Sequence, residues 1–287
     1  MASIPIIAGL SEIAGDYDAL FCDIWGVVHN GREAYIEAIA ALRQFRAERG
    51  PAILMTNAPR PVSEVRSFLE GLGVPQDCYD AIVSSGTVAR DDLARRAEAA
   101  SDTLPILHIG PERDRGVFKG LDVETVDISE AHIALCTGLF DDEVETPDDY
   151  TPDLLTMKSR GMIMLCANPD LVVQRGDQLI WCAGALAEAY EKLGGRVVYY
   201  GKPHPPIYEA ALKEARKATG RGIIRPLAVG DGADTDIKGA NRVAIDAVFV
   251  AQGIHAAQVG DLAAEGLAQL FAVPDARPKA AMRALVW

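Results

Sequence analysis

Short apolar runs alternate with segments of helical period through the first third of the chain. The apolar runs are Ala19–Cys22, Ala52–Met55 and Ala81–Val83, and amphipathic stretches lie near Glu33–Glu48 and Ser63–Leu72. Alternating strands and helices are typical of a parallel sheet that is covered on both faces. The pattern therefore predicts an α/β fold with a doubly wound parallel sheet, whose ligands should bind at the carboxyl ends of the strands.

The same alternation restarts between about Ser85 and Trp181. This part has its own apolar runs at Pro105–Ile109, His132–Cys136 and Met162–Cys166, and the acidic stretch Asp141–Asp153 separates the last two runs. That is enough chain for a second α/β domain. We therefore predict an α/β domain that is inserted into the first one.

The elements after the insertion are predicted to complete the first domain. They are helices at Ala183–Leu193 and Pro206–Lys217 and strands at Val197–Tyr200, Pro226–Val229 and Ala247–Val250. The predicted boundaries are residues 1–84 for the first part of the core domain, 85–182 for the inserted domain and 183–287 for the second part of the core.

Composition indicates a folded, acidic protein. Of the 287 residues, 49% are hydrophobic and 24% are charged, and this length has room for roughly two domains. Lysine and arginine number 28 against 41 acidic residues, which gives a formal net charge of −13. This charge repels nucleic-acid phosphates and anionic lipids. We therefore expect neither a nucleic-acid nor a membrane partner.

The sequence predicts a location in the cytoplasm. No apolar run approaches the length of about 18 residues that a membrane span needs, and no basic leading segment precedes the apolar amino terminus. The five cysteines lack the spacing of a zinc site, and several lie in apolar runs where a reduced thiol packs as a small hydrophobe. We expect a soluble cytoplasmic protein without disulfides or zinc.

Four polar segments each end a predicted strand: Asp23–Val27, Met55–Asn57, Gly201–Pro203 and Gly230–Asp236. Because the carboxyl ends of parallel strands meet at one edge of a sheet, these segments bring carboxylates, a hydroxyl and an ammonium group together. Carboxylates hold Mg²⁺, and a hydroxyl, an amide and a lysine bind phosphate oxygens. A single aspartate at a strand end is more often a turn residue or a helix cap, so the prediction of a phosphate-handling site depends on all four segments.

In order and position these segments resemble the signature of the haloacid dehalogenase superfamily, and the resemblance covers about the whole chain. It extends to class IIA, the branch that includes p-nitrophenyl phosphatase and relatives of the N-acetylglucosamine-operon phosphatase. Asp23-Ile24-Trp25-Gly26-Val27 is similar to the first motif, Thr56-Asn57 to the second, Gly201-Lys202-Pro203 to the third and Gly230–Asp236 to the fourth. Class IIA proteins carry a large α/β cap between their second and third motifs, which matches the insertion at 85–182.

The resemblance implies a role for each residue of these motifs. Asp23 is implied to be the nucleophile and a ligand of Mg²⁺. The other implied metal ligands are the backbone carbonyl of Trp25, the carboxylate of Asp231 and, through water, Asp236. The residues implied to bind phosphate are Thr56, Asn57 and Lys202.

The resemblance also suggests residues for substrate contact. Asn168-Pro169-Asp170 resembles a segment that recurs near the return of the cap to the core, so Asn168 and Asp170 are candidates. Arg113 either faces an anionic substrate or belongs to an exposed charged turn. Relatives of this class are often dimers, so a homodimer is a further expectation.

Trp25 departs from the usual Asp-Xaa-Asp of the family. The backbone carbonyl at this position survives the change, but the side-chain acid that protonates the leaving group and later activates water does not. General acid and base catalysis is worth about 10²–10⁴-fold, so poor leaving groups should suffer most. His29 either replaces the missing acid or serves the loop that follows the nucleophile, and Asp234 either supports the metal site or is a solvated turn residue.

Together these features predict a Mg²⁺-dependent phosphohydrolase that acts on a small phosphorylated metabolite, a phosphomonoester, through an aspartyl-phosphate. Its turnover should be slow or restricted to good leaving groups such as aryl or acyl phosphates. The alternative is a metal- and phosphate-binding sensor or scaffold that no longer turns over. An aromatic residue two positions after the nucleophile also resembles the Asp-Xaa-Tyr of haloacid dehalogenases, which need no metal. The acidic residues Asp231, Asp234 and Asp236 argue against that activity.

Overall fold

The computed structural model describes residues 3–175, 178–220, 222, 225–260, 262–273 and 275–287. The chain divides into two compact units. The first unit contains the described residues of Met1–Thr56, Ser63–Val83 and Lys202–Trp287, and the second contains Asn57–Val62 and Ser84–Gly201. The start of the predicted core domain at residue 1 lies outside the described residues.

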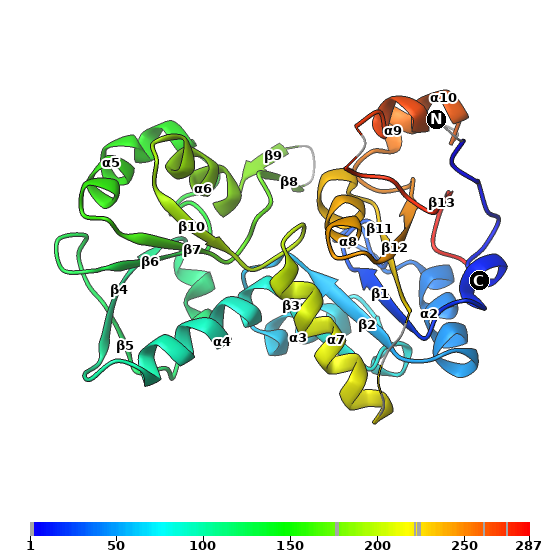
Figure 1. The fold of residues 1–287 in the computed structure, drawn as a ribbon, viewed down its shortest axis with the longest axis horizontal. Coiled ribbons are helices and arrows are strands. Elements are labelled where there is room, and N and C mark those ends of the chain that lie inside the picture. The colour runs from blue at the N-terminus through cyan, green and yellow to red at the C-terminus, as the bar shows by residue number, and fades with distance from the viewer. Residues whose placement is uncertain (1–2, 176–177, 221, 223–224, 261, 274) are drawn as a thin grey trace. The chain divides into compact units, whose positions relative to one another are not determined.

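A six-stranded sheet forms the centre of the first unit (Figure 1), in the order β13-β12-β11-β1-β2-β3. The strands are β1 (Ala19–Asp23), β2 (Ala52–Thr56), β3 (Ala81–Ser84), β11 (Pro226–Gly230), β12 (Asp246–Val250) and β13 (Ala280–Met282). Strand β1 pairs in parallel with both neighbours, since Phe21 lies opposite Ala228 in β11 and Ile53 in β2. All five residues of β1 are buried, as expected for the middle of a parallel sheet.

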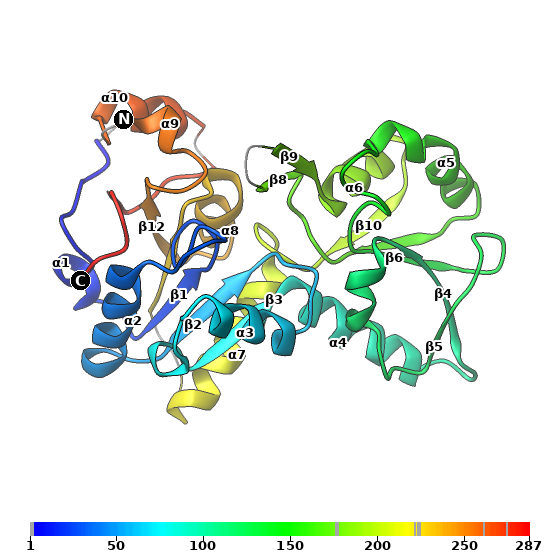
Figure 2. The same ribbon diagram turned by 180° about the vertical axis from the view of Figure 1, so that it is seen from behind.

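Helices cover both faces of this sheet. Figure 1 shows α7 and α8 toward the viewer, and Figure 2, from behind, shows α2 and α3 there. The helices of the unit are α1 (Ser11–Ala14), α2 (Ile36–Glu48), α3 (Val62–Gly71), η1 (Gln76–Cys78), α7 (Pro205–Thr219), η4 (Ala233–Ile237), α8 (Lys238–Arg242), α9 (Ala256–Val259) and α10 (Ala264–Leu270). The predicted doubly wound parallel sheet is therefore confirmed. Among the described residues, no helix has both the length and the apolar character that a bilayer span needs.

Local sequence explains the limits of α7. Prolines at 205 and 206 occupy its first turn, where the missing amide hydrogen costs nothing. Its last residue is followed by Gly220, whose φ of 66° is the left-handed conformation that ends many helices. One face of the helix buries Ile207, Tyr208 and Ala211. Helix α7 thus begins just after Lys202 and fixes where that side chain enters the core.

Segments near both ends of the chain lie together at one edge of the six-stranded sheet. Strand β13 pairs in parallel with β12, with Phe249 opposite Ala281. Backbone bonds of 2.9 Å join Ile7 and Pro5 to Ala281 on its other side. No element was predicted beyond Val250, because β13 is only three residues long and has no polar alternation. This edge strand is thus an addition to the predicted sheet.

The second unit is built on a sheet of five parallel strands, in the order β10-β7-β6-β4-β5. Its strands are β4 (Leu104–Ile109), β5 (Val123–Thr125), β6 (Ile133–Cys136), β7 (Ile163–Cys166) and β10 (Arg196–Tyr199). A separate antiparallel hairpin is formed by β8 (Val172–Arg175) and β9 (Gln178–Trp181). The hairpin was not predicted from the sequence.

Two apolar clusters cover the two faces of this sheet. The helices of the unit are α4 (Ser85–Glu98), η2 (Glu112–Val117), η3 (Pro147–Tyr150), α5 (Thr151–Ser159) and α6 (Ala183–Lys192). Leu154 of α5 and Leu186 of α6 pack with Met164 of β7 on one face. Leu93 of α4 packs with Leu165 of β7 on the other. Adjacent residues of β7 thus enter opposite cores, which explains why this strand reads as a continuous apolar run.

The second unit extends further along the chain than the predicted insertion. The sequence predicts that Ala183–Leu193 and Val197–Tyr200 belong to the core domain, but the structure places α6 and β10 in the second unit, which ends at Gly201. Strand β10 pairs with β7, where Val198 lies opposite Leu165. An apolar run identifies a strand but not the sheet that it joins, so the predicted boundary at residue 182 is too early.

All five cysteines are free and buried. Burial raises the pKa of every one of these thiols above its usual value. They belong to both units: Cys22 lies in β1, and Cys136 and Cys166 end β6 and β7. They pack as small apolar residues.

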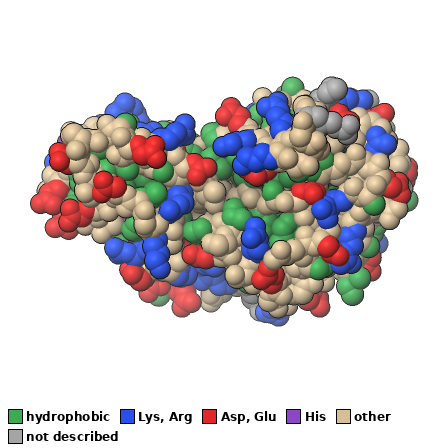
Figure 3. All heavy atoms as spheres, turned by 90° about the horizontal axis from the view of Figure 1, so that it is seen from below, with side chains coloured by type: hydrophobic (Ala, Val, Ile, Leu, Met, Phe, Trp, Pro, Cys, Tyr) green, Lys and Arg blue, Asp and Glu red, His purple; other side chains and the backbone are tan. Residues whose placement is uncertain are grey.

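Charges of both signs are mixed on the surface. On the face in Figure 3, lysine and arginine side chains are interspersed with aspartate and glutamate. Ion pairs of the protein include Arg43 with Asp77 and Lys192 with Glu188. Exposed pairs of this kind contribute about 0–1 kcal/mol each to stability.

Candidate active site

Three acidic side chains meet at the carboxyl edge of the six-stranded sheet. Asp23 is the last residue of β1, Asp231 directly follows β11, and Asp236 lies in the short π-helix η4. Each of them offers an oxygen, and these oxygens all lie within 4.8 Å of one another. All three residues are buried. The structure therefore brings together the carboxylates that the sequence predicted at one edge.

Lys202 lies between two of these carboxylates. Its Nζ donates to Asp23 Oδ1 at 2.5 Å and to Asp236 Oδ1 at 2.7 Å. Burial disfavours the ammonium, but the attraction of Asp23 and Asp236 outweighs it and raises the pKa of Lys202 well above its usual value. Lys202 therefore stays charged at neutral pH.

The remaining negative charge is costly to bury. Burial raises the pKa of Asp23 well above its usual value, and the nearby charge of Asp236 acts in the same direction. Burial and Asp236 also raise the pKa of Asp231 to about 6, although the Ile254 amide donates to its Oδ2 at 2.7 Å. One ammonium faces three carboxylates, so the site favours a further cation. Carboxylate oxygens are the hard donors that Mg²⁺ prefers.

Backbone glycines allow the chain to approach these carboxylates closely. Gly26 has a φ of +80°, and a Cβ there would lie 2.2 Å from Asp231 Oδ2. A Cβ on Gly253 would lie 1.8 Å from the same oxygen. The sequence did not predict the Gly253-Ile254 segment as part of the site. It follows the apolar strand β12 just as the four recognised segments follow theirs, and that signal could have found it.

Asp236 is held by donors on both of its oxygens. Lys202 binds Oδ1, while the Gly232 amide donates to Oδ2 at 3.1 Å and the Thr235 hydroxyl at 3.2 Å. The Tyr208 hydroxyl donates to the backbone carbonyl of Asp236 at 3.2 Å. Asp236 is thus fixed in one orientation, with its charge directed at Lys202.

The two predicted phosphate-binding residues of the second motif fall on either side of a unit boundary. Thr56 is the last residue of β2, and Asn57 opens the short part of the second unit. The Asn57 amide donates from Nδ2 to Asp170 Oδ1 at 2.8 Å, and the Asp170 backbone amide donates to Asn168 Oδ1 at 3.1 Å. The candidate substrate residues Asn168 and Asp170 therefore form a turn that orients Asn57, a relationship that the sequence did not predict.

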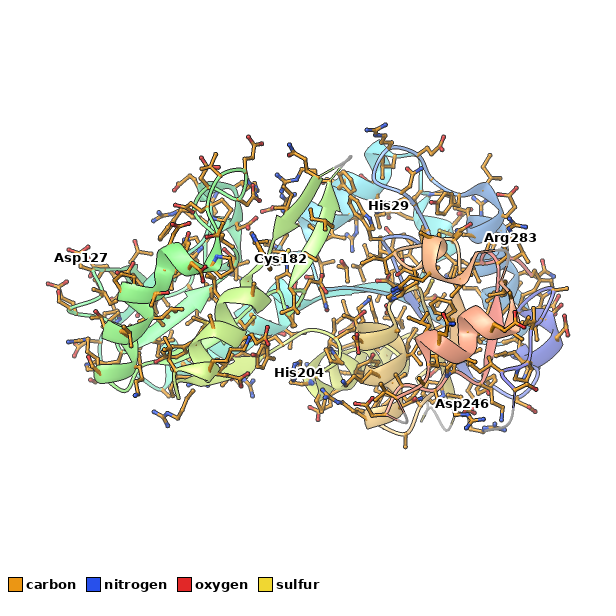
Figure 4. All side chains as sticks on the ribbon, turned by 90° about the horizontal axis from the view of Figure 1, so that it is seen from above. His29, Asp127, Cys182, His204, Asp246 and Arg283 are labelled. Atoms are coloured by element: carbon orange, nitrogen blue, oxygen red, sulfur yellow. The ribbon has the colours of Figure 1, made fainter. Side chains whose placement is uncertain are left out.

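The loop after β1 is built around Trp25 and His29. The Trp25 and His29 rings pack edge to face with centroids 5.2 Å apart (His29 is labelled in Figure 4). His29 is buried, and its Nδ1 accepts a hydrogen bond from the Gly31 amide at 2.9 Å. Burial lowers the pKa of His29 to about 4, so the ring is neutral near pH 7. These contacts favour the loop role for His29 over that of a replacement acid.

Asp234 and Arg113 lie away from buried polar clusters. The Asp234 side chain is 88% exposed and lies 3.8 Å from Lys238, as in a solvated turn. Arg113 is paired with Asp142, which also accepts from Arg175 at 2.8 Å. The structure thus places Arg113 in a charged surface turn of the second unit.

The doubly wound sheet with acidic residues at its carboxyl edge defines a Rossmann-like α/β protein. A family model described as haloacid dehalogenase-like hydrolase matches residues 20–124, and a second, HAD-hydrolase-like model matches residues 199–275. The crystal structure of a hydrolase of the haloacid dehalogenase-like family from Brucella suis 1330 is 45% identical. It covers 98% of this chain and 100% of its own, with a TM-score of 0.84. The chain therefore belongs to the haloacid dehalogenase-like hydrolases, as the sequence resemblance predicted.

Two further relatives are phosphatases. D-glycerol 3-phosphate phosphatase from Mycobacterium tuberculosis is 27% identical over 271 residues, which are 86% of this chain and 67% of that protein. The p-nitrophenyl phosphatase from Archaeoglobus fulgidus is 19% identical, with a TM-score of 0.70 over 94% of this chain and 97% of its own. At that identity the likeness shows a shared fold. The fold is thus that of one of the class IIA proteins that the sequence resembled.

Proposed function

We propose that this chain is a Mg²⁺-dependent phosphohydrolase that acts on a small phosphomonoester. The observation that carries the proposal is the buried group of Asp23, Asp231 and Asp236 with Lys202 bonded to two of them. An acidic group and an ammonium at the carboxyl edge of a parallel sheet match the needs of phosphoryl transfer. The similarity to phosphatases of the same family supports the proposal.

The donor set suits a magnesium ion. Asp23 and Asp231, together with the backbone carbonyl of Trp25, would hold it, and Asp236 would support it through water. Bound Mg²⁺ supplies positive charge that offsets the repulsion between a carboxylate and a phosphoryl group. The fit rests on the three buried carboxylates, whose charge exceeds what Lys202 alone can neutralise.

In the proposed reaction an oxygen of Asp23 attacks phosphorus in line with the leaving group. The new bond joins Asp23 to phosphorus, and the bond between phosphorus and the leaving oxygen breaks. Water then hydrolyses this aspartyl-phosphate, which returns the carboxylate of Asp23 and releases inorganic phosphate. Lys202, Thr56 and Asn57 bind the phosphoryl oxygens. Lys202 already contacts Asp23, so it is placed to stabilise charge on the group that Asp23 attacks.

Trp25 limits which leaving groups can depart. An indole ring cannot donate a proton to the leaving oxygen, and His29 is buried, neutral and committed to its own loop. The departing group must therefore be stable as an anion. This supports slow turnover or a preference for aryl and acyl phosphates over sugar phosphates.

The decisive experiment replaces Asp23 by Asn and measures Mg²⁺-dependent release of p-nitrophenol from p-nitrophenyl phosphate. We expect activity to be abolished in Asp23→Asn and, in the unchanged protein, by EDTA. Asp234→Asn is the matched control, because it removes an acidic group that is exposed rather than part of the buried cluster. Full activity in Asp23→Asn contradicts the nucleophile assignment.

A second experiment restores an acid at position 25. Trp25→Asp should raise the rate on poor leaving groups such as glycerol phosphate, by a factor of up to about 10²–10⁴. The rate on p-nitrophenyl phosphate should change less, because that leaving group needs little protonation. Equal effects on both substrates contradict the assignment of Trp25 as the cause of slow turnover.

The second candidate function is a sensor or scaffold that binds metal and phosphate without turnover. Trp25 is the observation that favours it, because position 25 lacks the acid on which turnover depends. Isothermal titration with Mg²⁺ and inorganic phosphate, beside an activity assay on a panel of phosphate esters, separates the two functions. Binding without any turnover above that of Asp23→Asn supports the sensor, and Mg²⁺-dependent turnover of any ester excludes it.

Two further expectations concern the setting of the protein. We propose a cytoplasmic location, supported by five buried thiols that are all free. We also propose that the protein is a homodimer, because class IIA relatives are often dimers. Light scattering after size-exclusion chromatography tests the second proposal, and a mass near 30.7 kDa contradicts it.

A further inference from the structure

Trp25 is an exposed aromatic side chain whose ring packs against its own loop. The residue is 46% exposed, yet its ring is held in place by its own loop. An exposed tryptophan costs hydration free energy, and a fixed one also costs conformational entropy. Burial in the core would offset both of these costs, but Trp25 remains partly exposed. Its ring is therefore a candidate surface for binding a ligand.

The loop holds the ring from two sides. A Cβ on Gly31 would lie 2.5 Å from Cη2 of Trp25, so the ring lies directly on this glycine, whose φ is +87°. His29 packs against the indole edge to face. The loop itself is closed by hydrogen bonds of 2.8 Å from the Gly26 amide to His29 and from the Val28 amide to Ile24. The orientation of the ring is therefore set before any ligand binds.

The same loop touches the proposed reaction site. Trp25 is two residues after Asp23, and the next residue, Gly26, packs so closely against Asp231 that a Cβ would lie 2.2 Å from its Oδ2. The exposed indole therefore belongs to the same short loop that carries Asp23 and approaches Asp231.

We propose that the Trp25 ring is a binding subsite for the leaving group, and that it selects phosphomonoesters with a flat aromatic leaving group by stacking. This inference rests on the proposed phosphohydrolase function and adds a substrate class to it. Aromatic pairs are favoured by offset or edge-to-face geometry beyond their area of contact. Trp25 already makes one edge-to-face contact, with His29, and its remaining exposed surface is free for a second ring.

A second line of reasoning leads to the same class of substrate. A sugar alkoxide leaves poorly without an acid, and the side chain at position 25 supplies none. An aryl oxide is stabilised by its own ring and leaves without that acid. The residue that removes the acid from position 25 is thus also the residue that stacks on aryl groups.

The experiment compares 2-naphthyl phosphate with phenyl phosphate, whose leaving groups have similar acidity but different stacking area. Trp25→Leu keeps an apolar side chain and removes the aromatic face. We expect it to raise KM for 2-naphthyl phosphate about two- to tenfold more than KM for phenyl phosphate. Phe68→Leu is the matched control, because Phe68 is a 43% exposed ring that also packs edge to face against His29. An unchanged ratio in Trp25→Leu overturns the inference.

A binding measurement separates this inference from the proposed function. Titration calorimetry with 2-naphthylmethylphosphonate, which cannot be hydrolysed, reports the subsite even in a protein without turnover. If the unchanged protein has no phosphatase activity but binds the phosphonate more tightly than Trp25→Leu does, the proposed function is rejected and the subsite is kept. Equal binding by the unchanged protein and Trp25→Leu rejects the subsite alone. If Trp25→Leu does not fold, Trp25→Phe serves the same comparison with a smaller expected change.

Discussion

The ammonium of Lys202 donates a 2.5 Å hydrogen bond to the carboxylate of Asp23, across 179 positions of the sequence. It also bonds to Asp236, so a single buried cation joins the end of β1 to the turn after β11. Breaking a buried pair by removing one partner leaves uncompensated charge and costs far more than the pair contributes. Lys202 is therefore expected to matter for stability as well as for catalysis.

Lys202→Met should destabilise the protein by about 3–5 kcal/mol, measured by urea unfolding near pH 8. The control is Lys192→Met, whose exposed pair with Glu188 should contribute less than about 1 kcal/mol. Without the ammonium, the pKa of Asp23 rises further above its unfolded value, so the folded variant takes up protons as the pH falls. Its deficit should therefore shrink between pH 8 and pH 5, and a constant deficit contradicts the electrostatic explanation.

Gly26→Ala should weaken Mg²⁺ binding about 10- to 100-fold, because the new methyl group displaces the Asp231 carboxylate. Gly120→Ala is the matched control: its φ is +77°, close to the +80° of Gly26, but nothing lies within 4 Å of the new Cβ. Both variants should lose about 1–2 kcal/mol of stability from the left-handed backbone. Titration calorimetry with Mg²⁺ separates them. Similar affinities in the two variants contradict the role of Gly26.

Asp170→Ala should raise KM about two- to tenfold with little change in kcat, because Asn57 loses the acceptor that orients its amide. Asp170→Asn keeps an acceptor oxygen at the same place and should restore most of the affinity. Steady-state kinetics on p-nitrophenyl phosphate measures both constants. A fall in kcat alone, or a failure of Asp170→Asn to rescue KM, argues against a positioning role.

Acid should destabilise the protein through its buried histidines. Burial, and secondarily Arg115, lowers the pKa of His108 to about 4, whereas the unfolded residue titrates near 6.5. The unfolded state therefore binds more protons between these values, and stability falls as the pH drops from about 6.5 toward 4. Asp231, with a pKa of about 6, acts in the opposite direction, so the informative quantity is a difference between variants.

His108→Gln isolates this contribution, since the glutamine amide reaches about as far as Nε2 of His108 and can still bond to Thr137, which lies 3.0 Å from that nitrogen. The unchanged protein should lose about 1–3 kcal/mol more than His108→Gln between pH 7 and pH 4.5. Urea unfolding at a series of pH values measures it. Parallel pH profiles for the two proteins contradict the prediction.

Strand positions were predictable because they depend on local pattern. The runs at Ala19–Cys22 and Pro226–Val229 correspond to β1 and β11, and the polar residues that follow them meet at one edge. The partner of a strand depends on distant residues, so the sheet that β10 joins was predicted wrongly. Elements as short as β13 carry too few residues for a period to show.

The candidate site also has parts that were predictable from the sequence and parts that were not. Its carboxylates were found because each follows an apolar strand. The bond from Asn57 to Asp170 was not found, because it depends on how two distant segments pack. The Gly253 segment was missed although it follows the apolar strand β12, because it carries no charged side chain. A motif thus identifies which residues belong to a site, while their mutual orientation comes from the packing of the whole unit.

The buried cysteines provide the protein with an internal reporter of its own opening. A thiolate is the reactive form, and burial suppresses it at Cys22 in β1 as well as at Cys136 and Cys166 in the second sheet. Alkylating reagents can therefore modify these residues only when the surrounding structure opens or unfolds locally. Since Cys22 belongs to one unit and Cys136 to the other, mass spectrometry of labelled peptides would time the unfolding of each unit separately, without any engineered probe.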